Sequence, residues 1–194
     1  MKIRNGFVSN SSSSSFILKL GKLPTSVEET KVMFYGENPP ILTNFWDDAI
    51  STQKVAEVLF KDFKDPDTMN LNQMISEVKE ELGGFDEYSY REGYDFVEGT
   101  EFGDEFNKLY DKIKYFEKTS NKYGKNWDWK KHYDKIDEMS KPMLDLVEKA
   151  IRVKYNEDDV FCKMEYADES GGIFAYIEHG GVLDPITVQK FSHH

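Results

Sequence analysis

Apolar residues recur at the spacing of an α-helix through four segments in the middle of the chain, between residues 51 and 154. In each segment they repeat every three or four residues, which places them on one side of a helix. The pattern predicts helices over residues 51–63, 70–82, 104–119 and 129–154. Ser51 or Thr52 can cap the first helix, and Gly83-Gly84 can end the second. Pro142 lies inside the last helix, so we expect a kink or two abutting helices there.

Both ends of the chain alternate apolar and polar residues, which is the pattern of a half-buried strand. Residues 15–20 (SFILKL) predict one strand, and residues 31–35 (KVMFY) predict a second. Residues 160–166 and 173–178, separated by turn-forming residues, predict a hairpin. Strands, helices and then a hairpin favour the α+β class. We expect a small antiparallel sheet, made of the N-terminal strand and the C-terminal hairpin, packed against four or five helices.

The length of 194 residues fits a single domain over residues 1–194, in which residues 51–103 could form an acidic helical subdomain. Hydrophobic residues make up 39% of the chain, enough for a core. No apolar run approaches the ~20 residues of a membrane span, and no apolar leader precedes the N-terminal serines. We therefore expect neither a membrane protein nor a secretory signal. Cys162 is the single cysteine, which excludes an intrachain disulfide framework and favours a reducing, cytoplasmic setting.

The net charge of −11 is concentrated in one part of the sequence. Residues 57–105 contain 15 acids and four bases, a difference of −11, whereas the remaining acids and bases balance. Such a charge distribution repels nucleic-acid phosphates and attracts basic surfaces. We therefore expect no direct nucleic-acid binding and favour a basic protein partner. A solvated acidic face that aids solubility explains the same residues equally well, and the sequence leaves both interpretations open.

Acids and aromatic residues alternate in the centre of this acidic segment. Residues 84–103 contain six aromatic residues among acids and glycines, and we expect a loop or short irregular pieces there. Aromatic side chains left exposed would suit a protein interface. The candidate partner-binding residues are Glu77, Glu80, Glu81, Phe85, Asp86, Glu87, Tyr88, Tyr90, Glu92, Tyr94 and Asp95.

The sequence contains no recognisable catalytic or metal-binding motif. His132 and His179 stand apart from each other and from Cys162, and His193-His194 closes the chain, so no metal-ligand spacing occurs. There is no Gly-x-Ser-x-Gly nucleophile turn, Walker pattern or Rossmann glycine fingerprint. We expect no enzyme, no cofactor and no metal. An enzyme that acts on a nucleotide or a sugar through two carboxylates stays as an alternative, although no pair stands out among so many acids.

Five consecutive serines, Ser11 to Ser15, stand close to the start of the chain, just before the apolar Phe16. A serine run can form a flexible arm, a bent lead-in whose hydroxyls bond neighbouring backbone, or a cradle of amides and hydroxyls for an anion. The apolar Phe7 and Val8 ahead of the run favour an anchored segment. We therefore expect the bent lead-in to the first strand.

The opening of the chain resembles that of small proteins encoded by large lytic bacteriophages. The matching residues are Arg4, Gly6, Phe7, Val8, Ser9, Asn10, Ser11 to Ser15 and Phe16. In length and acidity the chain is also similar to sigma-factor-binding proteins of lytic staphylococcal phages. That resemblance implies a non-enzymatic protein of the host cytoplasm. Its partner would be the host RNA polymerase sigma factor, bound at the domain that reads the promoter −35 element. Binding would inhibit or redirect host transcription. The alternative is an acidic DNA mimic that inhibits another basic host protein.

Overall fold

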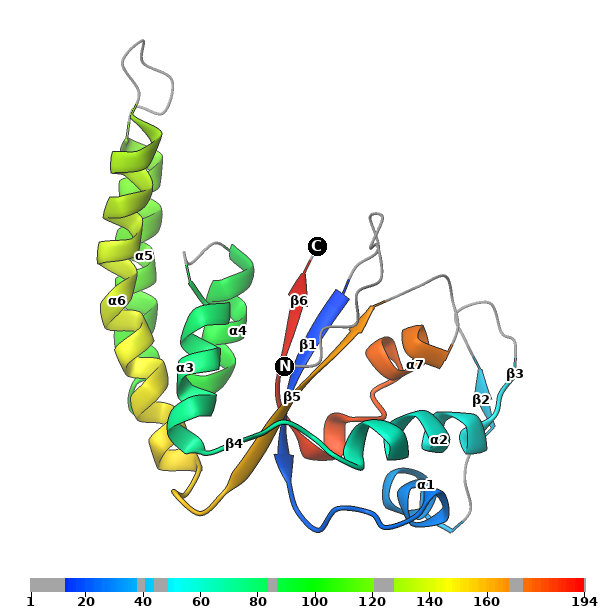
Figure 1. Ribbon diagram of the computed structural model, residues 1–194. Coiled ribbons are helices and arrows are strands. Elements are labelled where there is room, and N and C mark those ends of the chain that lie inside the picture. The colour runs from blue at the N-terminus through cyan, green and yellow to red at the C-terminus, as the bar shows by residue number, and fades with distance from the viewer. Residues whose placement is uncertain are drawn as a thin grey trace. The chain divides into compact units, whose positions relative to one another are not determined.

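A computed structural model describes residues 13–37, 41–43, 49–83, 87–120, 128–167 and 173–193 (Figure 1). Within these residues the chain forms six strands, seven α-helices and one 3-10 helix. The strands are β1 (Ser13–Leu20), β2 (Leu42–Thr43), β3 (Ala49–Ile50), β4 (Thr68–Met69), β5 (Val160–Ala167) and β6 (Thr187–His193). The helices are α1 (Val27–Tyr35), α2 (Thr52–Phe63), α3 (Leu71–Glu81), α4 (Glu87–Val97), α5 (Gly103–Thr119), α6 (Trp129–Lys154), α7 (Ile173–His179) and the 3-10 helix η1 (Asp184–Ile186). The predicted α+β class is confirmed.

The chain divides into two compact units. The sheet unit contains Met1–Asn70 and Asp159–His194, so both ends of the chain belong to it. The helical unit contains Leu71–Asp158. Residues 51–103, which the sequence suggests as an acidic subdomain, are divided between the two, because α2 and β4 belong to the sheet unit whereas α3 and α4 belong to the helical unit.

Four antiparallel strands form the main sheet of the sheet unit, in the order β4-β5-β1-β6. β1 lies between β5 and β6, with Ser14 opposite Tyr166 on one side and Ser192 on the other. The ladder between β1 and β6 shifts register between Ile17 and Leu18. The predicted strand at residues 15–20 is confirmed, and it lies in the same sheet as the predicted strand at residues 160–166. β2 and β3 form a separate two-stranded ladder.

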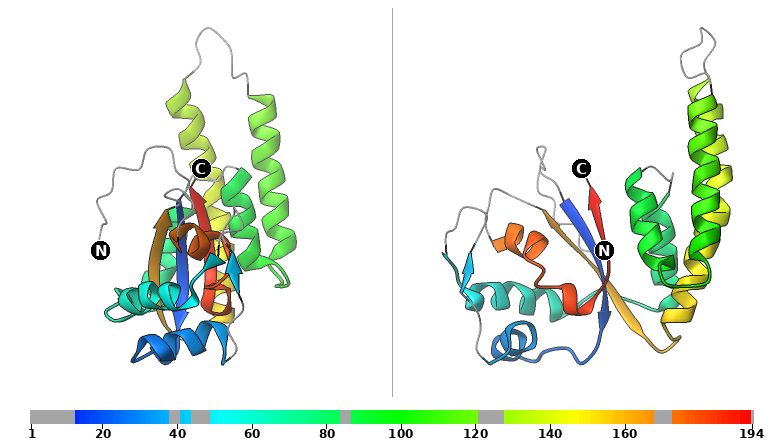
Figure 2. Two further views of the ribbon diagram at one scale, coloured as in Figure 1. Left: turned by 90° about the vertical axis from the view of Figure 1, so that its right-hand side faces the viewer. Right: turned by 180° about the vertical axis from the view of Figure 1, so that it is seen from behind.

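The core of the sheet unit lies between β1 and β5 on one side and α2 and α7 on the other (Figure 2). Phe16 of β1, Phe63 of α2 and Ile177 of α7 belong to one apolar cluster, and each is at most 2% exposed. α1 joins this core from the far side of α2, where Phe34 stacks on Phe63 with ring centres 5.9 Å apart. The helices cover one face of the sheet, so the apolar sides of the helices and of the strands bury each other, as is usual in the α+β class.

Four helices form the helical unit. α5 and α6 make an antiparallel hairpin, which α3 and α4 contact near one of its ends (Figures 1 and 2). The apolar positions that helical spacing predicts are mostly buried: Leu71, Met74, Ile75 and Val78 of α3, Phe106 and Ile113 of α5, and Ile136, Met143, Val147 and Ile151 of α6. Tyr133, which the same spacing assigns to the apolar side of α6, is instead 56% exposed.

α6 continues through Pro142 as one helix, so the two abutting helices that the sequence allows are not found. Proline lacks the N–H that would reach the carbonyl of Glu138, four residues earlier. Both residues are exposed, so water can satisfy that carbonyl. Asp128 caps the start of the helix, where its side chain accepts the backbone N–H of Lys131 at 3.1 Å.

The strand predicted over residues 31–35 is wrong, because those residues form the second half of α1. The helix begins at Val27, before the alternating pattern, and its N-cap is Ser26, whose hydroxyl oxygen accepts the N–H of Glu29 at 3.1 Å. The Glu29 carboxylate in turn accepts the N–H of Thr25 at 2.7 Å. The hydrogen bonds from the backbone and side chain of Thr25, followed by Lys22, lower the pKa of Glu29 to about 2. These capping interactions favour a helix over a five-residue alternation.

The second strand of the predicted C-terminal hairpin is also wrong. Residues 173–179 form α7, and the strand that returns beside β1 is β6, which the sequence analysis did not identify. The apolar residues of IFAYIE fit helical spacing as well as alternation, and as a helix they place Ile177 in the core. Gly181, at a φ of 66°, supplies the left-handed backbone conformation that follows the helix.

The loop expected over residues 84–103 is largely the helix α4. Tyr90, Tyr94 and Val97 repeat at the spacing of one helix side. Gly93 and the acids between them hide this period, because glycine is unfavourable inside a helix. Packing against α5 and α6 outweighs that low intrinsic propensity.

Candidate functional site

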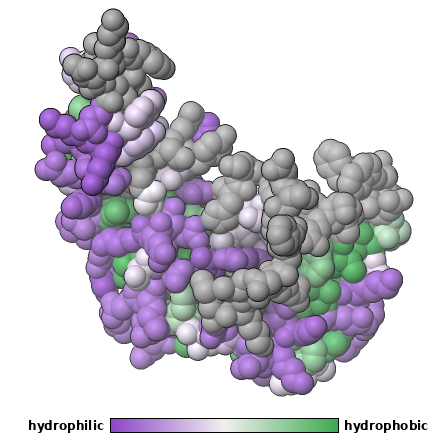
Figure 3. All heavy atoms as spheres, turned by 45° about the horizontal axis from the view of Figure 1, so that its top comes forward, coloured by the Kyte–Doolittle hydropathy of each residue, from purple (hydrophilic) through white to green (hydrophobic). Residues whose placement is uncertain are grey.

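The predicted acidic surface lies in the helical unit, on α3, α4 and the start of α5. Residues 71–107 contain eleven acids and two bases, a local charge of −9. Among the acids whose side chains are described, the exposed ones are Glu80, Asp95, Glu98, Glu101, Asp104 and Glu105. On the face in Figure 3, hydrophilic side chains cover much of the surface, and the larger hydrophobic areas lie over the sheet unit. The exposed carboxylates make this part of the helical unit attractive to cations.

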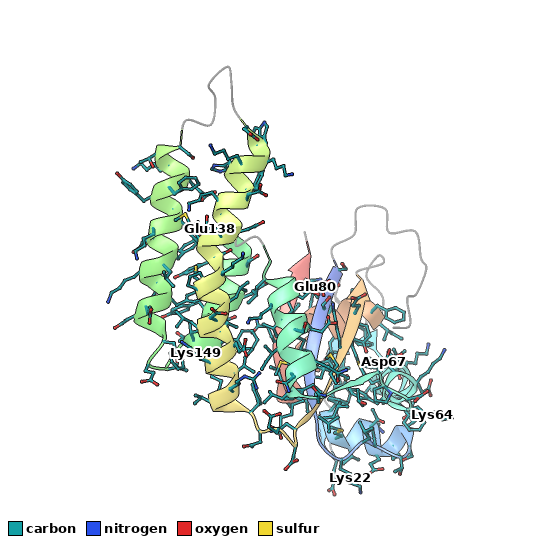
Figure 4. All side chains as sticks on the ribbon, turned by 60° about the vertical axis from the view of Figure 1, so that its left-hand side comes forward. Lys22, Lys64, Asp67, Glu80, Glu138 and Lys149 are labelled. Atoms are coloured by element: carbon teal, nitrogen blue, oxygen red, sulfur yellow. The ribbon has the colours of Figure 1, made fainter. Side chains whose placement is uncertain are left out.

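The three candidate glutamates of α3 differ in exposure. Glu80 is exposed (Figure 4), whereas Glu77 and Glu81 are half-buried. Lys79, the base of this helix, is bound to α6: its Nζ donates to the carboxylate of Glu148 and lies 3.6 Å from Oδ1 of Asp145. The hydrogen bond from Lys79 lowers the pKa of the Glu148 carboxyl. Lys79 therefore pairs with acids of α6 and not with the neighbouring Glu80.

The candidate tyrosines of α4 pack between helices. The ring of Tyr90 stacks on Tyr110 of α5 with centres 3.7 Å apart, and its hydroxyl donates to Oδ1 of Asn107 at 2.8 Å. Tyr94 lies 6.0 Å from Tyr90 and 6.3 Å from Phe106, again by ring centres. Burial raises the pKa of the Tyr90 hydroxyl, with smaller contributions from Tyr94 and Asp111. These contacts give both tyrosines a structural role, whereas the sequence analysis placed them among the candidate partner-binding residues.

The remaining candidates divide between described and undescribed positions. Phe85 and Asp86 lie outside the described residues. Glu87 and Tyr88 belong to α4, but their side chains are not described. Glu92 is half-buried and Asp95 is exposed. Glu80 and Asp95 are thus the candidate acids that the described surface exposes.

Further exposed acids follow at the turn between α4 and α5, where the predicted set ended too early. Glu98 and Glu101 are exposed in the turn, and Asp104 and Glu105 occupy the first turn of α5. Acids at this position are stabilised by the positive end of the helix dipole. The sequence analysis predicted that this helix starts near residue 104, so the acids of its first turn could have been recognised from the sequence. These four carboxylates extend the acidic surface beyond Asp95.

A buried polar cluster in the sheet unit was not predicted. The hydroxyl of Ser14 donates to Oε1 of Glu178 at 2.8 Å, and the Glu178 side chain is fully buried. Lys190 donates to the backbone oxygen of Glu178 at 2.6 Å, and Nε2 of His179 lies 3.8 Å from Oε2 of Glu178. Ser13 to Ser15 belong to β1, and Ser14 bonds a carboxylate of α7 rather than neighbouring backbone, whereas the rest of the predicted lead-in lies outside the described residues. The sequence analysis missed the contact because it placed residue 178 in a strand.

Other chemically reactive groups give little support for catalysis. Burial raises the pKa of the Cys162 thiol to about 12, which keeps the sulfur protonated near neutral pH. Within the described ranges, no three His, Cys, Asp or Glu side chains gather in a way that could hold a metal ion. The expected absence of enzyme activity, cofactor and metal stays a prediction.

No helix in the described part of the chain is both long and apolar enough to span a membrane.

Comparison with protein-family models, curated proteins and solved structures finds no match to this chain. The exposed acids of α3, α4 and the start of α5 are therefore the main basis in the structure for a functional proposal. Such a surface can bind a basic macromolecule.

Proposed function

We propose that this chain is a phage-encoded protein that binds the host RNA polymerase sigma factor, at the domain that reads the promoter −35 element, and that it inhibits or redirects host transcription. The proposal is carried by one observation: the local charge of −9 over residues 71–107, with six exposed carboxylates on α3, α4 and the start of α5. The resemblance of residues 4–16 to phage proteins supports the same conclusion.

The chemistry of the proposed partner matches this surface. A promoter-reading helix-turn-helix domain holds its recognition helix against DNA, so its DNA-facing surface must be basic. An acidic surface attracts such a domain over several ångströms and speeds association at low salt. Occupation of the DNA-facing surface would then compete directly with promoter binding.

The structure changes which residues should carry the contact. Tyr90 and Tyr94 take part in packing between α4 and α5, so we assign the contact first to exposed carboxylates. Glu80, Glu98 and Glu101 are exposed and belong to α3 and to the turn before α5. Their lysine variants should fold, since exposed substitutions of this kind change stability little.

The test is a calorimetric titration of the sigma-factor promoter-reading domain with the full chain and with the Glu80→Lys/Glu98→Lys/Glu101→Lys variant. We expect the variant to bind at least about tenfold more weakly and with a smaller salt dependence. Glu138→Lys is the control for the charge change per residue, because Glu138 is 66% exposed on α6 and lies outside the acidic surface (Figure 4). Unchanged affinity of the triple variant, or absence of binding by the unaltered chain, would contradict the proposal.

A DNA mimic that inhibits another basic host protein would use the same carboxylates. The two functions differ in the protein that is captured, so an affinity purification from staphylococcal lysate separates them. Recovery of polymerase subunits with sigma supports the proposed function. Recovery of a different DNA-binding protein, released by added duplex DNA and without polymerase, would favour the mimic.

A further inference from the structure

One end of the α5–α6 hairpin has the opposite charge from the acidic surface of the same unit. We define the hairpin end as residues 112–120 of α5 and its C-cap and residues 129–135 of α6. It contains six lysines and two acids, a difference of +4. The contacts of α3 and α4 lie toward the other end, at Tyr110 of α5 and at Asp145 and Glu148 of α6. Both hairpin helices extend past α3 and α4 in Figures 1 and 2.

Most lysines of the hairpin end are available to a ligand. Lys112, Lys118, Lys130 and Lys131 are exposed, and none of them forms an ion pair with another residue in the described ranges. The other two lysines have partners: Lys114 lies over the Tyr110 ring at 5.4 Å from its centre, and Lys135 pairs with Glu138 at 2.8 Å.

Exposed aromatic rings lie among these lysines. Of the large hydrophobic side chains that the described residues expose, the aromatic ones are Tyr115, Trp129 and Tyr133, at 70%, 55% and 56% exposure, and all belong to the hairpin end. On α5, Lys112 and Lys118 lie three residues before and after Tyr115, which makes them its neighbours on the helix surface. On α6, Trp129 and Tyr133 stack with ring centres 6.1 Å apart.

The hairpin end is also firmly built. The ring of Phe116 on α5 stacks on His132 of α6, with centres 5.3 Å apart and an angle of 18°. His132, Ile113 and Ile136 are each at most 6% exposed and fill the space between the helices. The exposed rings and lysines thus project from two helices that are packed together, so the backbone that carries them need not order on binding.

We propose that the hairpin end binds single-stranded nucleic acid. The ammonium groups contact phosphates, and the exposed rings stack on bases, which in a single strand are free of a complementary partner. An anionic membrane would attract the lysines too, and its interface accepts Trp and Tyr rings, but helices that lie on a membrane usually present aliphatic side chains on the same face. The aliphatic side chains that the described residues expose, such as Val32, Ile41 and Val153, lie elsewhere.

This inference runs against the expectation of no nucleic-acid binding, which came from the charge of the whole chain. Four of the acids responsible for that charge, Glu57, Asp62, Asp65 and Asp67, belong to the sheet unit, and the others lie between residues 77 and 105, outside the hairpin end. Exposed charges separated by more than the screening length of about 8 Å at physiological salt act nearly independently. A local basic surface can therefore bind phosphates on an acidic protein.

The test is fluorescence anisotropy of the full chain with labelled oligo-uridine and oligo-thymidine of about 15 nucleotides, a length that spans such sites. We expect binding at low salt, with a logarithmic salt slope near −3 if four lysines each neutralise one phosphate. Tyr115→Ala/Tyr133→Ala should weaken binding about tenfold or more, because each lost base stack costs about fivefold to a hundredfold. Lys112→Glu/Lys118→Glu should weaken it and roughly halve the slope.

Two matched controls separate the hairpin end from general effects. Lys149→Glu changes the charge by the same amount per residue on the other half of α6 (Figure 4), and Val153→Ala removes an apolar side chain that is 71% exposed on the same helix. Neither should alter affinity more than about twofold. Absence of binding to both oligonucleotides would overturn the proposal. Equal loss in the control variants would overturn it too, and so would binding to anionic vesicles by a chain that binds neither oligonucleotide.

Discussion

Glu178 in the sheet unit and Glu80 in the helical unit carry the same carboxyl group in opposite surroundings. The Glu178 side chain is fully buried and accepts the hydroxyl of Ser14, whereas Glu80 is exposed on α3. A buried carboxylate has lost its water and depends on protein donors, so its replacement changes the free energy of unfolding. An exposed carboxylate keeps its water and remains available to a partner.

The difference shows why a charge count from sequence cannot locate a binding surface by itself. Each of the 36 acids contributes equally to the net charge of −11, whatever its surroundings. Burial divides them into groups that should affect stability and groups that should affect binding. The following substitutions test that division, from the largest expected change in stability to the smallest.

Replacement of the buried carboxyl should have the largest effect. Glu178→Ala leaves the Ser14 hydroxyl without its acceptor in a buried site, so we expect the free energy of unfolding to fall by about 1–3 kcal/mol. Glu178→Gln keeps an acceptor for Ser14 and should stay within about 1 kcal/mol of the unaltered chain. Chemical denaturation measures both. If Glu178→Ala and the exposed Glu80→Ala were equally stable, burial would not distinguish the two carboxyls.

Tyr90 tests whether a candidate binding residue is structural. Tyr90→Phe keeps the ring stacked on Tyr110 but removes the hydrogen bond to Asn107, so we expect a loss of about 0.5–1.5 kcal/mol. Affinity for the partner, measured by the same titration as for the acidic variants, should not change. Weaker binding without a loss of stability would return Tyr90 to the interface.

The ion pairs of Lys79 should contribute least. Lys79→Met removes the pairing with Glu148 and Asp145, which are partly exposed, so we expect a loss of about 0.2–1 kcal/mol near neutral pH. Because the folded protein lowers the pKa of Glu148, this stabilisation is present above the ordinary carboxyl pKa of 4.5 and is lost as the pH falls through the lower folded value. Urea denaturation of both proteins across the acid range should therefore show the difference between them shrinking. A difference that grows toward acid pH would contradict this assignment.

The sequence predicted the helical unit better than the sheet unit. The helices near residues 70–82, 104–119 and 129–154 were predicted from apolar spacing, which is set by contacts three and four residues apart. In the sheet unit, α1 and α7 were predicted as strands, and β6 was not identified. Short apolar runs fit both periods, and their structure depends on partners far away in the sequence.

The candidate site was predicted in part. The acidic character of α3 and the exposure of Glu80 and Asp95 agree with the sequence analysis. The packing of Tyr90 and Tyr94 on α5 could not be predicted, because the segment was expected to be irregular. The exposure of Tyr133 could not be predicted either, since its spacing matches the buried side of α6 and only the limited extent of α3 and α4 leaves it uncovered.

By itself, the sequence determined the α+β class, three of the four helices of the helical unit, and the concentration of acids in one part of the chain. These properties depend on residue type and on neighbours within one helical turn. Only the tertiary structure decided that β1 pairs with both β5 and β6, that Glu178 is buried against Ser14, and that α4 is a helix. Ser14 and Glu178 are 164 positions apart, and the loop-closure entropy that opposes such a contact must be offset by the packing of the residues around it.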